Sequence, residues 1–333
     1  MSKGKMRSPS FVRSISSKLS MARGPTSRAV APLPEQSRFS EVVTPRLDGL
    51  RSSDHDCGVS SSWIVDVLDV IIGSQIVAEE SLSVNNSLIT LSDVGREMIE
   101  DYLEDNVELL DACNGLIEKM SVIQKYIDFL RTTVRLIEGN NIEPTNVTTL
   151  ARTQEIFKQC SELEGECATL DKCSPKLNKL VGKKSIQMSN NDIQEEELHE
   201  VLSGSKEIAS IGCHLLQRAL SFKSRQGSMK MRSKLPTTWS SSLNELKITM
   251  NENAERRKLC APWMMKELEI MVANAKALHD QVKSQMRNVD IVSLKRSCAA
   301  LEEGIIPLEE RVRELYKHLI SIRMTLLGIL SRN

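Results

Sequence analysis

The feature that most constrains this chain is an uninterrupted helical pattern from Arg96 to Glu138. Charged residues in this stretch alternate with apolar ones that recur every three or four positions: Leu103, Val107, Leu110, Cys113, Ile117, Met120, Ile123, Ile127, Leu130, Val134 and Ile137. Because an α-helix turns once in about 3.6 residues, this spacing places the apolar residues along one side of a single helix. Ser92 or Asp93 is suited to cap its start, and Gly139 followed by Pro144 ends it. Such a long amphipathic helix needs helical partners, which predicts an all-α fold.

Similar patterns predict further helices at 60–78, 146–180, 196–222 and 240–258, and another that begins at Pro262. The last helix carries a seam from Leu301 to Ile329 in which apolar residues alternate at steps of four and three. We expect this seam to pack inside the protein rather than to form a homodimer. Pro175 should kink or shorten its helix, and Pro307 should kink its helix or mark a restart. The predicted fold is an elongated bundle of about six or seven long amphipathic helices.

The stretch from Ser60 to Ala78 is the most hydrophobic part of the chain and could be mistaken for a membrane span. Asp66 and Asp69 interrupt it, and a span needs about 20 predominantly apolar residues. We therefore predict a helix that is buried in the protein core.

Residues 1–60 are rich in Ser, Pro, Arg and Gly, and their apolar residues are isolated, which predicts a disordered tail. Basic residues before Glu35 have no acidic counterpart: Lys3, Lys5, Arg7, Arg13, Lys18, Arg23 and Arg28. One interpretation is a solvated basic tail that touches anionic lipid or is phosphorylated at Ser8 or Ser16, in a cytoplasmic protein that can lie at a membrane surface. The other is a transit peptide that directs the protein to plastids. Residues 61–333 are then a single helical domain.

The composition argues against several classes of function. The 44 acidic residues balance the 44 basic residues, and only 3% of residues are aromatic, so neither a basic field nor aromatic platforms indicate nucleic-acid binding. Phosphate-binding loops, GxSxG and HExxH are all missing, and carboxylates on solvent-facing stripes are explained by ion pairs. None of the eight cysteines forms a CxxC pair, so we expect free thiols. The sequence predicts no enzyme, cofactor or metal site.

A strongly basic segment begins near the end of the predicted helix at 196–222 and continues through a basic loop at 223–238. Its six basic residues precede the next acidic residue, Glu245, and they are Arg218, Lys223, Arg225, Lys230, Arg232 and Lys234. They form a candidate patch for an anionic membrane or an acidic partner. Phosphorylation of Ser228, which follows Arg225, would weaken that attraction. A solvated loop without a partner is the alternative.

Short motifs in a characteristic order resemble the plant BYPASS-related family, which includes BYPASS-like and ROH-like proteins. The matching pieces are Ser62-Trp63, Leu91–Asp93, Tyr102–Asp105, Leu109–Asn114, Leu235–Trp239, Met250-Asn251 and the closing stretch Leu294–Leu330. Together they cover the chain from about Ser60 to its end. Some members are more hydrophobic where this chain has His214, Gln217, Arg218 and Lys223.

The resemblance implies an α-helical, non-enzymatic plant protein that acts in development or stress signalling. It implies restraint of a root-derived mobile signal that arrests shoot growth, or binding of trafficking proteins. Exocyst-type subunits and signalling adaptors are the partners that it suggests, and the oligomeric state stays open. The alternative is a small-molecule binder or an enzyme that acts on a metabolite precursor of the mobile signal. That alternative predicts a closed cavity with converging polar groups.

Overall fold

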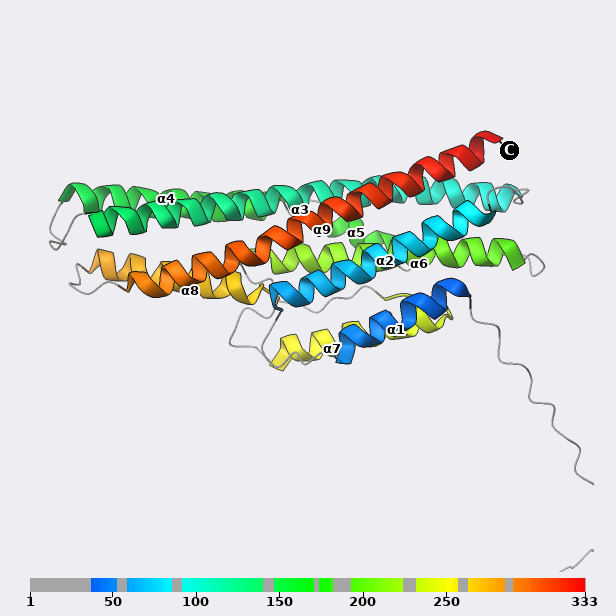
Figure 1. Ribbon diagram of the computed structural model, residues 1–333, viewed down its shortest axis with the longest axis horizontal. Coiled ribbons are helices and arrows are strands. Elements are labelled where there is room, and N and C mark those ends of the chain that lie inside the picture. Colours follow the sequence, from blue (N-terminus) through cyan, green and yellow to red (C-terminus); the bar gives the residue numbers. More distant parts are fainter. Residues whose placement is uncertain are drawn as a thin grey trace, which may run out of the picture. The chain divides into compact units, whose positions relative to one another are not determined.

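The computed structural model describes residues 37–52, 59–85, 92–139, 147–170, 174–181, 193–223, 232–256, 263–284 and 290–332. Within these ranges the chain forms nine α-helices and no strand (Figure 1). They are α1 (Arg38–Ser52), α2 (Ser61–Asn85), α3 (Asp93–Gly139), α4 (Val147–Thr169), α5 (Ser174–Leu180), α6 (Ile193–Ala219), α7 (Thr238–Arg256), α8 (Lys266–Lys283) and α9 (Ile291–Arg332). All nine helices belong to one compact unit, at 36–333. The predicted all-α bundle is confirmed.

Helices α3 and α9 are the two longest elements, with 47 and 42 residues. The side chain of Ser92 caps α3 as predicted, because its Oγ accepts a hydrogen bond of 3.1 Å from the N–H of Gly95. Helix α9 packs along both α2 and α3 (Figure 1). The α9 seam is buried at every position from Leu301 to Ile329, so its predicted internal packing is confirmed. Pro307 lies inside a continuous helix and does not mark a restart.

Helix α6 is enclosed by α2, α3 and α5, with a smaller contact to α7. Every residue from Glu207 to Phe222 is buried, including the polar side chains of His214, Gln217 and Arg218. A helix with one apolar face would leave such residues in water. Because neighbours cover α6 on several sides, these polar residues lie inside the protein instead.

Helix α2 is the one described helix that is long and apolar enough to cross a membrane. About two thirds of its most apolar window, 67%, is buried inside the protein. Its buried residues include Trp63, Ile64 and Leu68, which belong to the main hydrophobic core. Burial against α1, α6 and α9 accounts for its apolar composition without a membrane.

Helix α1 corrects the predicted extent of the N-terminal tail, because residues 38–52 lie within the stretch assigned to disorder. Its residues Phe39, Val43, Leu47 and Leu50 are buried, and their spacing of 4, 4 and 3 marks one helical face. Pro45 in the middle of the helix and polar flanking residues hide this face in the sequence. Helix α1 packs against α2 and α7. The rest of the predicted tail, 1–36 and 53–58, lies outside the described residues.

Other boundaries also differ from the prediction, among them the end of α2, which extends to Asn85 rather than 78. The helix expected at 146–180 ends early, at Thr169, which was one of the two outcomes predicted for Pro175. A separate helix, α5, begins at Ser174 and has Pro175 in its first turn. Helix α6 begins at Ile193 and ends at Ala219, three residues before each predicted boundary of 196–222. Helix α8 starts at Lys266 rather than at Pro262. Trp263, Met264 and Met265 precede its first turn and are buried in the core.

Candidate interaction surface on helix α9

A surface groove of about 600 Å³ lies between α2 and α9. Its lining residues are Glu79 of α2 and Glu310, Arg313, Glu314, Lys317, His318 and Ser321 of α9. The apolar seam of α9 is buried against its neighbours, which turns these charged residues outward. The groove is therefore polar, and its α9 wall is held in place by the packed seam.

Glu79 joins the two walls of the groove. The Nδ1 atom of His318 lies 3.3 Å from Oε2 of Glu79, and the hydroxyl of Ser321 donates to the other carboxylate oxygen. Nucleophilic catalysis by serine needs a hydroxyl aimed at a base that a third group orients. Here the hydroxyl of Ser321 and the imidazole of His318 both point at the carboxylate of Glu79, which differs from that arrangement. The three residues therefore connect α9 to α2.

The other charged residues of the groove differ in their partners. Arg311, next to the groove, pairs with Asp69 of α2 at 2.9 Å and with Glu314 at 2.6 Å. Arg313 pairs with Glu309 one turn away at 2.5 Å. Lys317 is exposed and has no ionic partner among the described residues. One cationic side chain of the groove is thus available to an outside group.

Beyond the groove the outer side of α9 becomes apolar. Ile320, Met324 and Leu327 are 39%, 64% and 42% exposed, and their spacing of four and three aligns them on one face. We call these three residues the apolar strip. Large contiguous apolar patches are a feature of interaction sites, whereas single exposed apolar residues are normal on a protein surface. The alignment of three such residues on one face makes this face the candidate interaction surface. The strip is opposite in character to the charged groove, and Lys317 and Ser321 connect the two.

The predicted basic patch is only partly described. Arg218 is buried in α6 with its guanidinium carbon 4.6 Å from the ring centroid of Trp263, so it belongs to the core and not to a surface patch. This cation–π contact explains why an arginine is tolerated there. Lys223, Arg232 and Lys234 are exposed. Arg225, Lys230 and the candidate phosphosite Ser228 lie outside the described residues.

Two anchors hold the ends of the basic segment. Phe222 packs on Tyr126 of α3 with ring centroids 4.8 Å apart. At the other end, Ser233 exchanges two hydrogen bonds with the side chain of Asn244, one of 3.1 Å from its N–H and one of 3.0 Å to its carbonyl. The exposed cations Lys223, Arg232 and Lys234 therefore stand next to fixed points of the bundle.

Cysteines in the described part of the chain are free and buried: Cys113, Cys160, Cys167, Cys213 and Cys298. Burial raises the pKa of Cys160 to about 12 and that of Cys298 to about 11, which keeps both thiols protonated near neutral pH. No group of three or more His, Cys, Asp or Glu side chains in the described ranges could hold a metal ion. Cys57, Cys173 and Cys260 lie outside those ranges.

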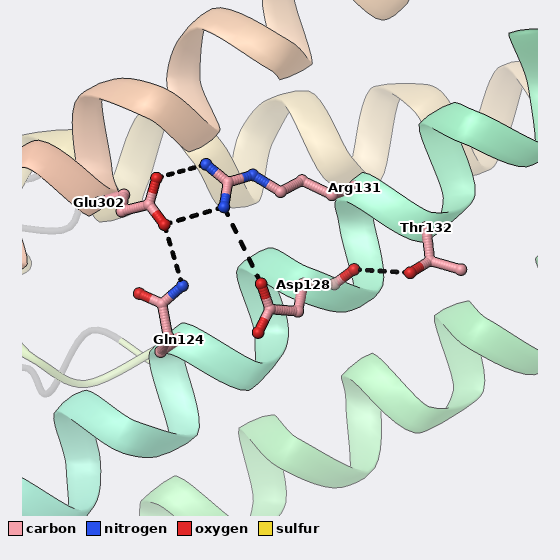
Figure 2. A network of polar contacts seen from close by, with 5 residues as sticks. All are labelled: Gln124, Asp128, Arg131, Thr132 and Glu302. Carbon is pink, nitrogen blue, oxygen red and sulfur yellow. Dashed lines mark hydrogen bonds and ion pairs between the residues drawn. The ribbon is translucent and has the colours of Figure 1, made fainter.

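A polar network ties α3 to α9 on the other side of the seam (Figure 2). Glu302 accepts hydrogen bonds from both terminal nitrogens of Arg131, at 2.8 Å for the first of them, and from Gln124 at 3.2 Å. Arg131 holds the pKa of Glu302 below its usual range. Figure 2 also shows Asp128 beside the guanidinium, 3.9 Å away. Ion pairing explains these surface carboxylates, as the sequence predicted.

The groove and the apolar strip were not predicted from the sequence. Glu79 and Ser321 are 242 residues apart, so no local pattern relates them. The strip does leave a signal, because Leu319-Ile320 and Leu326-Leu327 are adjacent apolar pairs seven residues apart. The first member of each pair continues the buried seam, and the second lies on the exposed face.

Comparison with known proteins relates the chain to a plant family. The sequence model of the family described as Protein BPS1 matches residues 76–329. UPF0496 protein 4 of Oryza sativa subsp. indica is 25% identical over 224 residues, which are 66% of this chain and 48% of that protein. Protein BPS1, chloroplastic, of Arabidopsis thaliana is 25% identical over 243 residues, which are 72% of this chain and 68% of that protein.

The chain spans about half the length of the rice proteins that it matches, including UPF0496 protein 4 of Oryza sativa subsp. japonica. No solved structure matches it significantly. The family match extends from the middle of α2 to the end of the α9 seam, and therefore includes Glu79, the groove and the apolar strip. The chain belongs to the Protein BPS1 family, the BYPASS-related plant regulators that its sequence motifs resemble.

Proposed function

We propose that this protein is a non-enzymatic helical scaffold that binds a partner protein on the outer face of α9. The observation that carries the proposal is the exposed apolar strip, Ile320, Met324 and Leu327, beside the charged groove. Apolar anchors with a polar rim are the usual composition of a protein interface. The partners suggested by the family resemblance are exocyst-type trafficking subunits or signalling adaptors. Through them the protein would restrain the root-derived signal that arrests shoot growth.

Two properties of α9 support this choice of surface. Its inner seam is fixed in the core, so a partner meets a rigid helix and little conformational freedom is lost on binding. Met324, the most exposed member of the strip, has a flexible and polarizable side chain that adapts to different partner surfaces. Lys317 adds a cation at the junction with the groove, which favours a partner helix with an acidic residue next to its apolar face.

Replacement of the strip tests the proposal directly. We expect Met324→Lys with Leu327→Lys to abolish co-purification of exocyst subunits or signalling adaptors from plant cells, with partners scored by name. The matched control is Ile270→Lys with Val292→Lys, which changes two other exposed apolar residues, 45% and 66% accessible, away from the strip. Both doubles should fold normally by circular dichroism. Equal recovery of the same partners by the strip variant and the control would contradict the proposal, as would a monomer with no reproducible partner.

The basic segment supports a second contact, with an anionic membrane surface. Each basic residue near such a surface contributes about 1 kcal/mol. We propose that Lys223, Arg232 and Lys234, together with Arg225 and Lys230, draw the protein to phosphatidylserine-containing vesicles. Flotation with Arg225, Lys230, Arg232 and Lys234 changed to Gln should then fall to the level seen with neutral vesicles. Unchanged binding would refute this contact and leave the α9 proposal intact.

We make a separate proposal about the cell compartment, in which residues 1–35 direct the protein to plastids. The Arabidopsis relative carries the word chloroplastic in its name, which supports the transit-peptide interpretation of the basic N-terminal residues. Imaging of the protein tagged at its C-terminus, with and without residues 1–35, distinguishes the two interpretations. Plastid signal that depends on 1–35 supports import, whereas cytosolic or membrane-surface signal in both forms supports the solvated tail.

A further inference from the structure

Three helices bring uncharged polar side chains together in the interior of the bundle. Gln75 comes from α2, Tyr102 and Asn106 from α3, and Ser205 from α6, and each is at most 1% exposed. The carbonyl of Leu319 on α9 borders the same place, because it accepts a hydrogen bond from Asn106. We call Gln75, Tyr102, Asn106 and Ser205 the buried amide cluster. Unlike the groove and the apolar strip it is buried, and the proposed function does not account for it.

The hydrogen bonds within the cluster fix the orientation of both amides. Gln75 donates from Nε2 to the carbonyl of Ser205 at 2.9 Å, and Asn106 donates from Nδ2 to the carbonyl of Leu319 at 3.2 Å. If either amide were reversed, its oxygen would face a carbonyl oxygen, and two acceptors would be in contact. The Oε1 atom of Gln75 and the Oδ1 atom of Asn106 therefore point away from these two carbonyl oxygens, and both can only accept hydrogen bonds.

Three polar atoms of the cluster have no hydrogen-bond partner among the described residues: Oε1 of Gln75, Oδ1 of Asn106 and the hydroxyl of Tyr102. Ser205 and Asn106 approach the Tyr102 hydroxyl closely enough to lower its pKa, but burial dominates and raises that pKa to about 12. The hydroxyl thus stays protonated and can donate or accept. Buried polar atoms without partners are rare in proteins, and ordered water usually satisfies them.

The hydrogen-bonding capacity of these three atoms defines which molecule could bind to all of them. Two are acceptors only, and the third can donate, so the complementary molecule offers two donors and one acceptor. Water has this set of groups, and a buried water typically makes about three hydrogen bonds. We propose that the buried amide cluster is an internal hydration site in which ordered water joins α2 to α3 beside α6. Because the site forms only when all these helices are in register, it also specifies how they align.

Substitution of Tyr102 tests this proposal. If water bridges the cluster, Tyr102→Phe removes one of its hydrogen bonds, and the folded-to-unfolded ratio should fall about tenfold. In addition, water-¹⁷O magnetic relaxation dispersion should detect fewer long-lived internal waters in the variant than in the parent protein. The matched control is Tyr316→Phe, which removes the hydroxyl of a half-buried tyrosine on α9 and should change neither quantity.

Several results would overturn the proposal. If the cluster is dry, loss of an unpaired hydroxyl should leave the stability unchanged or raise it, because an unsatisfied buried group disappears. A stability loss with an unchanged number of long-lived waters would show that Tyr102 acts by packing alone. Native mass spectrometry that reveals a retained organic molecule, released by Tyr102→Phe, would assign the site to a small-molecule ligand instead.

Discussion

Lys119, which is fully buried in α3, donates its ammonium group to the main-chain carbonyl of Gln217 at 2.8 Å, near the end of α6. It also donates to the hydroxyl of Ser221 at 3.1 Å. The last carbonyls of a helix lack partners within the helix, and they form the negative end of its dipole. The buried ammonium group of Lys119 provides a charged donor to one of them, the carbonyl of Gln217.

Lys119→Met is expected to destabilise the protein by about 1–3 kcal/mol, because it leaves buried acceptors at the end of α6 without their charged donor. Urea unfolding measures this loss. The control is Lys125→Met, an exposed lysine on the same helix, which should change the stability by less than about 0.5 kcal/mol. Similar midpoints for the two variants would mean that the Lys119 ammonium is not needed in the core.

Gly212→Ala tests the close approach of α6 to α2. A Cβ atom at residue 212 would stand 2.0 Å from Cδ1 of Ile71 and 3.0 Å from its Cγ1, so the two helices must separate or Ile71 must change rotamer. We expect a loss of about 1–3 kcal/mol, as for other overpacked cores. Ile71→Val, which removes Cδ1, should restore part of this loss in the double variant.

Gly165→Ala provides the contrast for that prediction. Nothing lies within 4 Å of the Cβ position at this helical residue of α4. Alanine restricts the unfolded chain more than glycine, so thermal unfolding should show a stabilisation of about 0.5–1 kcal/mol. A loss of stability at Gly165, or a gain at Gly212, would contradict the packing described for these helices.

The Arg131–Glu302 pair should be worth about 1 kcal/mol, because its two parallel hydrogen bonds are favourable but both side chains are about one third exposed. Arg131→Glu should destabilise the protein, and the added change Glu302→Arg should recover most of the loss by restoring opposite charges. Unfolding at low and high salt completes the double-variant cycle. A reversed pair as unstable as the single variant would show that geometry specific to Arg131 dominates.

The long helices α3 and α9 follow from sequence because each carries an unbroken apolar stripe, and Ser92 is one of two candidate capping residues at the start of α3. The burial of α6 on several sides does not follow, because Gln217 and Arg218 are polar, and Trp263, which covers the Arg218 guanidinium, is distant in the chain. Helix α1 was missed because Pro45 interrupts a short stripe. In the candidate surface, Lys317 and the strip lie on a predicted helix, but only the packing of α9 shows which side faces outward.

Alkaline pH should destabilise the protein through its buried thiols. Burial raises the pKa of Cys298 from 9.0 in water to about 11 in the folded state. The folded protein therefore keeps a proton that the unfolded chain loses, so this contribution is fully present below pH 9 and is lost as the pH rises to 11. Cys298→Ala should make the decline of the unfolding free energy over pH 9–11 less steep. An unchanged slope would place the thiol in a more solvated environment.

The pairing of α1 with α7 limits how the chain can be shortened from its N-terminal side. Phe39 meets Trp239 edge to face with ring centroids 6.0 Å apart, and the hydroxyls of Ser40 and Thr238 are 2.7 Å apart. A protease cut at residue 60, the predicted end of the tail, would remove α1. Trp239, which is fully buried in the intact protein, would then lose its contact with Phe39. Maturation by cleavage therefore preserves the pairing of α1 with α7 only at bonds that precede α1.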